Sequence, residues 1–461
     1  MSGEENTGVL SLERINADII IIGSGQGGVP LAKKLSQKGK QVVLFERAKL
    51  GGSCINYGCT PSKMLLASAH MAASLRHADR LGVKATVEVD FPSVMGRIRE
   101  TTNNWSDGIA KDLKDNGVHL IRAEAAFAGE LQVRGAQTIV EAETIIINTG
   151  KSPAIPPIKG LAETPFLTYE TIWQLDRLPQ RTIVVGGGFV GVELGQAIAR
   201  LGSQVTIIET ADRLISREDE KVSTVLQDQL EEDQLNLVFN TRVNEVDYQD
   251  GVFIVSLTKG EPLEAECLLM ATGRRPNTVN LESSLGGVQL DKNEHVRVDE
   301  HFKTSAEGVY AIGDVTGQPA FTHVSWEDHR RIMAILDGQE RKQMDRVLGY
   351  TIFTEPQIGR AGLTRSQAEE QGYRAQEVEM PLSHVARATE TGSTRGFYRM
   401  VIDQQTDKIL GAALVGPETG ELIHVIIAHM ERESTWQDLD RSVHIHPTFA
   451  EGLASLARLF K

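Results

Sequence analysis

The stretch that decides the fold class is Ala17-Asp-Ile-Ile-Ile-Ile-Gly-Ser-Gly-Gln-Gly-Gly28. Its four consecutive isoleucines are typical of a strand that is buried on both faces. The glycines of a Gly-x-Gly-x-x-Gly pattern then follow, at Gly23, Gly25 and Gly28. Glycines at this spacing permit a tight turn and let the backbone approach a pyrophosphate at the N-terminus of the next helix. We predict that helix over 29–37, and then a strand over 41–45 that ends at Glu46, whose carboxylate can accept hydrogen bonds from ribose hydroxyls. The stretch therefore predicts a dinucleotide-binding unit.

The same pattern occurs a second time. Thr182-Ile-Val-Val185 leads into the glycines Gly186, Gly188 and Gly191. A helix to Leu201 and a strand over 204–208 follow, and the strand ends at Glu209. In both copies the acid lies 23 residues after the first glycine (46 − 23 and 209 − 186). The alternative for either copy is an ordinary glycine-rich turn without a ligand. Two copies with the same spacing, however, predict two nucleotide-binding units.

Each unit ends with a similar sequence segment. A strand runs into a Thr-Gly turn over 145–150, which ends at Thr149 and Gly150, and again over 268–273, which ends at Gly273. A further strand over 308–313 ends in Asp314, too far along the chain to serve the second fingerprint. We expect it to return to the first unit. The first domain is then discontinuous, and the second domain is inserted into it.

Two of the three cysteines, Cys54 and Cys59, lie in the segment Gly51-Gly-Ser-Cys-Ile-Asn-Tyr-Gly-Cys-Thr-Pro-Ser-Lys63. Positions five apart on a straight helix are separated by about 7.5 Å and do not face each other, whereas a disulfide requires α-carbons within roughly 7 Å. If the two cysteines pair, we expect Cys54 on an irregular turn, with Gly58 supplying backbone freedom. Pro61 suits a first helical turn. Cys59 would then lie near a helix N-terminus, which favours its thiolate.

Two structural alternatives to a redox pair are ordinary core cysteines and half of a zinc site. Zinc requires a second ligand pair at short spacing, and Cys267 stands alone before the second Thr-Gly turn, as a small buried apolar residue would. We therefore predict no metal ligands.

A disulfide and a nicotinamide exchange electrons through a flavin. Because Cys54 follows Glu46 by eight residues (54 − 46), we expect the flavin in the first unit and the nicotinamide cofactor in the second.

The second unit and the C-terminus supply the remaining chemistry. Glu209 would contact the adenine ribose and repel a 2′-phosphate, which favours NAD(H) over NADP(H). Arg213 and Arg217 lie nearby, could soften this preference, and leave NADP(H) open. His446 is the best candidate for the base that regenerates a dithiol. Glu451 could orient its ring. Proximity to a glutamate does not separate His446 from His444, and either is also consistent with an ordinary histidine near a helix start.

Composition excludes several classes of function. The 461 residues carry a formal net charge of −14 and no clustered basic stripe, so we expect neither nucleic acid nor anionic membrane as a partner. No apolar run approaches the roughly 20 residues of a membrane span. Residues 1–16 are polar and acidic, and we predict a flexible leader without a signal sequence. Three cysteines argue against a structural disulfide framework and favour a cytoplasmic protein.

Taken together, these motifs resemble the class I pyridine nucleotide–disulfide oxidoreductases, which include dihydrolipoamide dehydrogenase, glutathione reductase and mercuric reductase. The resemblance runs from Ala17 to Glu451 and also rests on Ala271-Thr-Gly-Arg-Arg-Pro-Asn277 and His446-Pro-Thr-Phe-Ala-Glu451. It implies a homodimer that binds FAD and NAD(H). By this resemblance Cys59 is the thiol that forms a charge-transfer complex with FAD, and Cys54 is the interchange thiol that attacks the substrate.

The resemblance also implies roles for other matched positions. His446, contributed across the dimer interface, is the acid/base with Glu451, and Lys63 beside the flavin pairs with Glu193. Asp314 contacts the FAD ribityl chain. The cofactor contacts expected at matched positions are Gly23, Gly25, Gly28, Glu46, Gly52, Thr149, Gly150 and Asp314 for FAD, and Gly186, Gly188, Gly191, Glu209 and Gly273 for NAD(H).

The expected fold is therefore α/β, with two Rossmann-like domains and a C-terminal α+β dimerisation domain. The boundaries we predict are 1–16 for the leader, 17–152 and 276–348 for the FAD domain, 153–275 for the NAD domain and 349–461 for the dimerisation domain. The expected activity is that of an NAD(P)H-dependent FAD disulfide reductase that acts on a small-molecule disulfide, an oxidant or a metal ion.

The mercuric reductase branch is closest in appearance, on the segments 385–388 and 394–397. The chain departs from that enzyme because it lacks a terminal cysteine pair and a metal-binding Cys-x-x-Cys domain, and because His446 stands where tyrosine is typical. The alternatives are a dihydrolipoamide dehydrogenase and a redox-sensing flavoprotein of low turnover.

Overall fold

The computed structural model describes residues 12–461, which divide into two compact units. The first unit comprises residues 12–60, 100–152 and 274–345, and the second comprises 61–99, 153–273 and 346–461. The helices α3 (Cys59–Arg76) and α4 (Phe91–Asp115) pass from one unit into the other.

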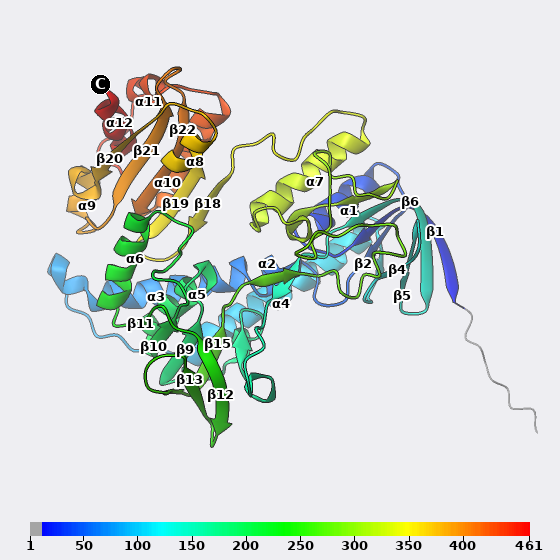
Figure 1. Ribbon diagram of the computed structural model, residues 1–461, viewed down its shortest axis with the longest axis horizontal. Coiled ribbons are helices and arrows are strands. Elements are labelled where there is room, and N and C mark those ends of the chain that lie inside the picture. The colour runs from blue at the N-terminus through cyan, green and yellow to red at the C-terminus, as the bar shows by residue number, and fades with distance from the viewer. Residues whose placement is uncertain (1–11) are drawn as a thin grey trace, which may run out of the picture. The chain divides into compact units, whose positions relative to one another are not determined.

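The sheet of the first unit is built around β1 (Glu13–Ile22), as Figure 1 shows. Its strand order is β3-β2-β1-β6-β5-β4, and β1 is parallel to β2 and β6. Ile19 and Ile21 face one core, and Ile20 and Ile22 face the other, because successive side chains point to opposite faces. The other strands are β2 (Val42–Phe45), β3 (His119–Ile121), β4 (Ala126–Gly129), β5 (Gln132–Gly135) and β6 (Thr138–Ile147).

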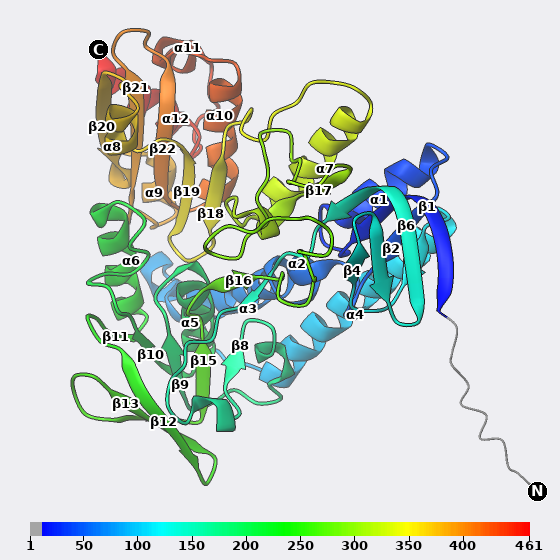
Figure 2. The ribbon, with the colours of Figure 1, turned by 45° about the vertical axis from the view of Figure 1, so that its right-hand side comes forward.

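Helices cover the face of this sheet that carries Ile19 and Ile21, and the C-terminal half of α4 adds Leu113 to the same core. Two of these helices are α1 (Gly28–Gln37) and α7 (Thr322–Leu336), which lie side by side in Figures 1 and 2. The strand β17 (Val309–Ala311), which precedes Asp314, pairs in parallel with β6. The chain thus returns to its first sheet after the second nucleotide-binding region, and the predicted discontinuous domain is confirmed.

The second fingerprint belongs to a five-stranded parallel sheet in the second unit, with the order β11-β10-β9-β15-β8. Its helix is α5 (Phe189–Leu201), and α6 (Glu220–Glu232) follows β10. The strands are β8 (Leu167–Thr168), β9 (Arg181–Val185), β10 (Gln204–Ile208), β11 (Asn236–Val238) and β15 (Cys267–Met270). An antiparallel sheet of β12 (Val243–Gln249), β13 (Val252–Leu257) and β14 (Leu263–Ala265) packs near it (Figure 2).

The C-terminal part of the second unit is an antiparallel sheet in the order β18-β19-β22-β21-β20. Its strands are β18 (Gly349–Ile352), β19 (Gln357–Gly362), β20 (Ala375–Pro381), β21 (Phe397–Asp403) and β22 (Ile409–Gly416). The helices α10 (Thr419–Glu431), α11 (Trp436–Arg441) and α12 (Glu451–Ala457) pack their apolar residues into one core with this sheet. Short helices α8 (Arg365–Glu370) and α9 (Ala386–Glu390) flank it.

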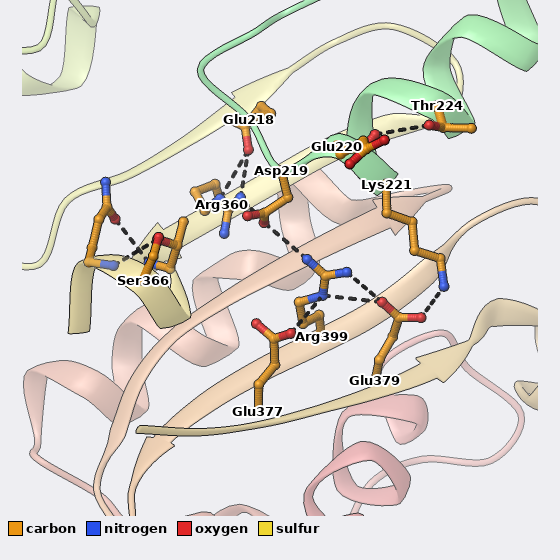
Figure 3. Close-up of polar contacts among 12 residues, drawn as sticks. Glu218, Asp219, Glu220, Lys221, Thr224, Arg360, Ser366, Glu377, Glu379 and Arg399 are labelled. Atoms are coloured by element: carbon orange, nitrogen blue, oxygen red, sulfur yellow. Dashed lines mark hydrogen bonds and ion pairs between the residues drawn. The ribbon is translucent and has the colours of Figure 1, made fainter. Parts of the chain in front are cut away.

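An ion cluster joins the second fingerprint region to the C-terminal sheet (Figure 3). Arg360 of β19 donates from Nη2 to Glu218 Oε2 and to Asp219 Oδ2, each at 2.7 Å, just before α6 begins. Arg399 of β21 donates from Nη2 to Glu379 Oε2 at 2.7 Å, and its Nη1 lies 3.1 Å from the Asp219 carboxylate. Glu218 is 3% exposed. Because it is buried, its charge depends on Arg360 for compensation.

The predicted fold class is confirmed: two Rossmann-like regions, one inserted in the other, and a C-terminal α+β domain. The residue boundaries of the domains stay a prediction. β1 begins at Glu13 and so includes 13–16, which we had assigned to the flexible leader, because those residues extend the pairing with β6. The rest of that leader, 1–11, lies outside the described residues. Within residues 12–461, no helix is both long and apolar enough to cross a membrane.

Candidate active site

The first fingerprint requires glycine for steric reasons. Gly23 has φ +105°, and a Cβ there would lie 2.4 Å from Asn148 O. A Cβ on Gly28 would lie 2.1 Å from Gly23 O. Distances this short exclude any side chain at Gly23 and Gly28. The strand and the following helix can therefore pack closely, as the turn that binds a dinucleotide requires. A Cβ on Gly52 would similarly meet the Gly25 Cα at 2.8 Å.

Glu46, at the end of β2, faces this turn. Its Oε2 accepts from Ser24 N at 3.0 Å and from Ser24 Oγ at 2.6 Å, and its Oε1 accepts from Ala48 N at 2.8 Å. The hydroxyl of Thr149 is buried and has no hydrogen-bond partner within the described residues, although a buried polar atom is costly without one. Glu46 and Thr149 thus offer polar groups where a dinucleotide would bind, and the residues fit FAD.

Asp314 lies just after β17 in the first unit. Burial raises the pKa of its carboxyl, and the positive charges of Arg274 and Lys151 oppose that rise. Arg274 Nη1 lies 3.2 Å from Asp314 Oδ2. A partly shielded carboxylate with one guanidinium beside it is a suitable acceptor for the hydroxyls of a sugar-like chain.

The second fingerprint repeats this construction. Gly186 has φ +112°, and a Cβ there would lie 2.5 Å from Ala271 O, while a Cβ on Gly191 would lie 1.9 Å from Gly186 O. A Cβ on Gly188 would meet nothing within 4 Å, so the space above the helix start is open. Glu209 Oε2 accepts from Gly187 N at 2.6 Å. The terminal acid thus lies beside the turn, as in the first copy.

Arg213, which left the cofactor preference open, is held on its own loop. Its Nη1 lies 3.3 Å from Asp212 Oδ1, and its Nη2 donates to Ser216 O at 3.2 Å. A guanidinium engaged in this way competes less well for a 2′-phosphate than one that points into the site.

The cysteine segment differs from our expectation in its local conformation. Cys54 lies in a short helix, α2 (Gly52–Asn56), and not on an irregular turn. The residues with positive φ are Gly51 (+99°) and Gly52 (+62°), so they supply the backbone freedom that we had assigned to Gly58. The chain turns after α2, where Tyr57 N and Gly58 N both donate to Ser53 O at 2.9 and 2.6 Å.

This turn brings the two cysteine positions toward each other. A Cβ on Gly58 would lie 3.6 Å from Cys54 Cα, and Cys59 follows directly as the first residue of α3. Asn56 is buried and donates to Leu50 O at 2.8 Å and to Gly52 O at 3.0 Å, which ties α2 to the preceding glycines. Cys59 Sγ also lies 3.1 Å from Thr322 Oγ1, at the start of α7.

Lys63 and Glu193 meet in the second unit. Lys63 Nζ lies 2.8 Å from Glu193 Oε2 and 4.5 Å from the centre of the Phe353 ring. Glu193, on α5, is 7% exposed and also accepts from Phe353 N at 2.8 Å through Oε1. The carboxylate is therefore fixed from both sides and presents a stable counter-charge to the lysine.

The C-terminal histidines are separated by their contacts. His446 Nδ1 lies 2.8 Å from Glu451 Oε2, at the start of α12, whereas no such contact joins His444 to Glu451 within the described residues. The His446 side chain is 70% exposed, and Val443 and Ile445 beside it are 98% and 78% exposed. The segment thus presents an oriented imidazole on the surface of the C-terminal domain.

Cys267 is confirmed as buried, in β15. Burial raises the pKa of its thiol to about 12, and a hydrogen bond with Thr182 only partly offsets that rise. Since the thiolate is the reactive form, iodoacetamide at pH 8 should leave Cys267 unlabelled in the native protein and label it fully in denaturant. Mass spectrometry of peptides containing Cys267 measures this, with reduced Cys59 as the control. Equal labelling rates for the two cysteines would contradict the assignment.

Sequence patterns did not predict Thr322, Phe353 or Asn148. Each lies far along the chain from the group that it contacts. Thr322 and Phe353 belong to no motif, and Asn148 lies within the stretch 145–150, where only Thr149 and Gly150 were singled out. The segments around Arg387 and Arg395 carry surface contacts: Arg387 pairs with Glu390, and Arg395 with Glu232.

Among the residues that the structure describes, no group of three or more potential metal ligands comes together.

Two glycine fingerprints, each at the end of a strand with parallel neighbours, and an antiparallel C-terminal sheet define a protein with two dinucleotide-binding regions. The sequence family described as pyridine nucleotide-disulphide oxidoreductase matches residues 17–328, and its dimerisation domain matches 349–457. The chain belongs to this family of flavoprotein disulfide reductases.

The relatives include two activities. The chain is 33% identical over 468 residues to a mercuric reductase of Lysinibacillus sphaericus, covering 100% of this chain and 85% of the relative. It is 34% identical over 452 residues to a dihydrolipoyl dehydrogenase of Thermus scotoductus, covering 95% of this chain and 96% of the relative. The Cu(II) complex of the HOCl-induced flavoprotein disulfide reductase RclA from Escherichia coli is 29% identical, with a TM-score of 0.89 over 97% of this chain and 100% of that chain.

Proposed function

We propose that this protein is an NADH-dependent FAD disulfide reductase that passes electrons through Cys54 and Cys59 to a disulfide, an oxidant or a metal ion. The observation that carries the proposal is the turn at Tyr57–Gly58, which sets Cys59 at the start of α3 and draws the Gly58 backbone against Cys54. This turn supports a dithiol formed by Cys54 and Cys59, because it brings the residue before Cys59 against the Cys54 backbone.

FAD, when bound, supplies two-electron chemistry between a nicotinamide and a thiol. The residues that would hold it are those of the first fingerprint with Glu46, Thr149 and Asp314. Glu193 would hold the Lys63 ammonium group in one position. The 2.8 Å contact between Lys63 Nζ and Glu193 Oε2, with the Glu193 side chain 10% exposed, supports this positioning role.

For the second nucleotide we propose NAD(H) over NADP(H). Glu209 faces the fingerprint turn, where its negative charge would repel a 2′-phosphate. The engagement of Arg213 with Asp212 and Ser216 supports the same preference.

With a disulfide acceptor, the Cys54 thiolate would attack one sulfur and form a mixed disulfide, and His446 would protonate the thiolate that leaves. Cys59 would then attack Cys54 Sγ, form the Cys54–Cys59 disulfide and release the second half of the acceptor as a thiolate, which takes its proton from solvent. The imidazole that gives up its proton would be restored by a cysteine thiol at the next turnover. Glu451 would hold the Nδ1 proton and so present Nε2 to the reacting sulfur. In the dimer that the dimerisation domain supports, His446 would serve the cysteines of the partner subunit.

A metal-ion acceptor would use the same dithiol. Two Cu²⁺ ions would each take one electron, Cys54 and Cys59 would join as a disulfide, and two protons would be released. Thiolates are suitable ligands for soft ions such as Cu⁺ and Hg²⁺. The likeness to mercuric reductase and to a reductase solved with Cu(II) supports this acceptor class.

A dihydrolipoamide dehydrogenase is the second candidate. The His446–Glu451 contact favours it, because an imidazole base is suited to a dithiol substrate. The likeness to the Thermus enzyme supports it as well.

The two candidates separate in one experiment. NADH oxidation is followed with lipoamide, glutathione disulfide, Hg²⁺ and Cu²⁺, with NADPH in a parallel series and Cys54→Ser as the control. The proposal predicts Cys54-dependent turnover with glutathione disulfide or with a metal ion and slow turnover with lipoamide. Fast lipoamide turnover would identify a dihydrolipoamide dehydrogenase. Slow turnover with every acceptor would indicate a redox sensor and refute both activities.

A further inference from the structure

We infer that the Thr322 hydroxyl belongs to the redox centre, where it donates a hydrogen bond to the Cys59 thiolate and sets its basicity. Cys59 Sγ lies 3.1 Å from Thr322 Oγ1 although the residues are 263 positions apart. The inference rests on the proposed role of Cys59 as the thiol that stays ionised.

Two helix starts converge on this sulfur. Cys59 is the first residue of α3, which has 18 residues, and Thr322 is the first residue of α7, which has 15. The N-terminal ends of both helices carry partial positive charge, which favours an anion. Each helix is long enough for its dipole to act at its first turn.

The side chain of Thr322 is well suited to hold a donor there. A β-branched residue has few χ1 rotamers in a helix, so the hydroxyl is restricted before any thiolate forms. Phe321 is the N-cap of α7 and makes no side-chain cap bond, and its ring stacks on His323 at 5.5 Å between centroids. This stacking restrains the first turn of α7.

Either atom of the 3.1 Å contact can donate, and the direction decides the effect. A hydroxyl that donates to a thiolate stabilises the charged form and lowers the pKa of the thiol. A thiol that donates to the hydroxyl oxygen would raise it. Hydrogen bonds to ions are roughly twice as strong as neutral ones, so donation from the hydroxyl is favoured once the sulfur ionises.

The titratable groups nearest to the contact along these elements are Cys54 on α2, His323 on α7 and Lys63 one turn further along α3. Further along, α7 carries Glu327, Asp328, His329, Arg330 and Arg331, and α3 carries His70 and Arg76. Removing the Thr322 hydroxyl changes none of these side chains. A shift in the titration of Cys59 would therefore report the hydrogen bond itself.

The test uses the FAD-loaded protein with Cys54→Ser, in which Cys59 titrates without its partner thiol. The rate at which iodoacetamide alkylates Cys59 is measured against pH, and the long-wavelength charge-transfer absorbance is measured on the same samples. Thr322→Val, which has nearly the same shape, should raise the midpoint of both curves by about one pH unit, a tenfold change in the ratio of thiolate to thiol. Thr322→Ser should restore the parent midpoint.

Two results would overturn the inference. They are a Thr322→Val midpoint equal to that of the parent, and a midpoint below it, which would mean that the thiol donates. If the parent itself titrates near the pKa of a free cysteine, about 8.5, without a long-wavelength band, the proposed role of Cys59 fails instead. Thr322→Ala repeats the comparison if the valine variant does not fold.

Discussion

Replacing Cys54 with serine should reduce NADH-dependent turnover of the physiological acceptor by roughly 10³-fold or more, because the sulfur that attacks the acceptor is removed. Replacing Cys59 should have an effect of similar size, because Cys54 could then form a mixed disulfide but not resolve it. Loss at both positions is expected since the two sulfurs act as one unit. Steady-state rates with a disulfide and with Cu²⁺ measure this effect.

The matched control is Cys267→Ala. Cys267 is buried in β15 and takes no part in the proposed chemistry, so this variant should retain turnover. All three variants should still bind FAD and reduce ferricyanide, an acceptor that needs no thiol. If Cys54→Ser retained most of its turnover, electrons would be leaving by another route and the proposed function would be wrong.

Replacing Arg360 with methionine should destabilise the second unit by about 3–5 kcal/mol, because it leaves a buried carboxylate without its partner. The side chains of Arg360 and Glu218 are 6% and 0% exposed, and their closest atoms are 2.7 Å apart. Glu218 also accepts from the Tyr350 hydroxyl, and that ring stacks on Phe189 at the start of α5. The loss should therefore reach the second fingerprint as well as the C-terminal sheet.

Denaturant unfolding at one fixed protein concentration measures the effect, because dimer stability depends on concentration. Arg365→Met is the matched control, since Arg365 and Glu369 form a solvent-exposed pair with side chains 57% and 49% exposed. It should leave the midpoint almost unchanged. The double variant Glu218→Gln with Arg360→Met should recover part of the loss. An Arg360→Met midpoint equal to that of the parent would contradict this account of the cluster.

The sequence predicted the parts of the fold that follow from local chemistry. Both fingerprints could be identified because their required glycines are set by local packing. Backbone atoms a few residues away, or on a neighbouring strand, leave no room for a side chain, as the position of Gly28 against Gly23 O shows. The helix after Cys59 followed from Pro61. The return of the strand before Asp314 to the first sheet could be inferred because Asp314 lies too far along the chain to contact a nucleotide at the second fingerprint.

What the sequence could not predict depends on residues that are distant in the chain. Thr322 reaches Cys59, and Arg360 reaches Glu218, only after the chain has folded, and neither pair has a characteristic spacing. The choice between Gly58 and Gly51 as the flexible residue depended on the conformation of α2, a helix of five residues. Helices this short leave little periodic signal.

The most direct test of the central claim is an anaerobic titration of the FAD-loaded protein with NADH, followed by absorbance. A redox-active Cys54–Cys59 disulfide takes up two electrons in addition to the two taken up by FAD. The account predicts that complete reduction needs about two equivalents of NADH per FAD, that a long-wavelength band appears near the first equivalent, and that Cys59→Ser lacks this band and needs one equivalent. Complete reduction of the parent protein by about one equivalent, without that band, would contradict the claim that electrons pass through these cysteines.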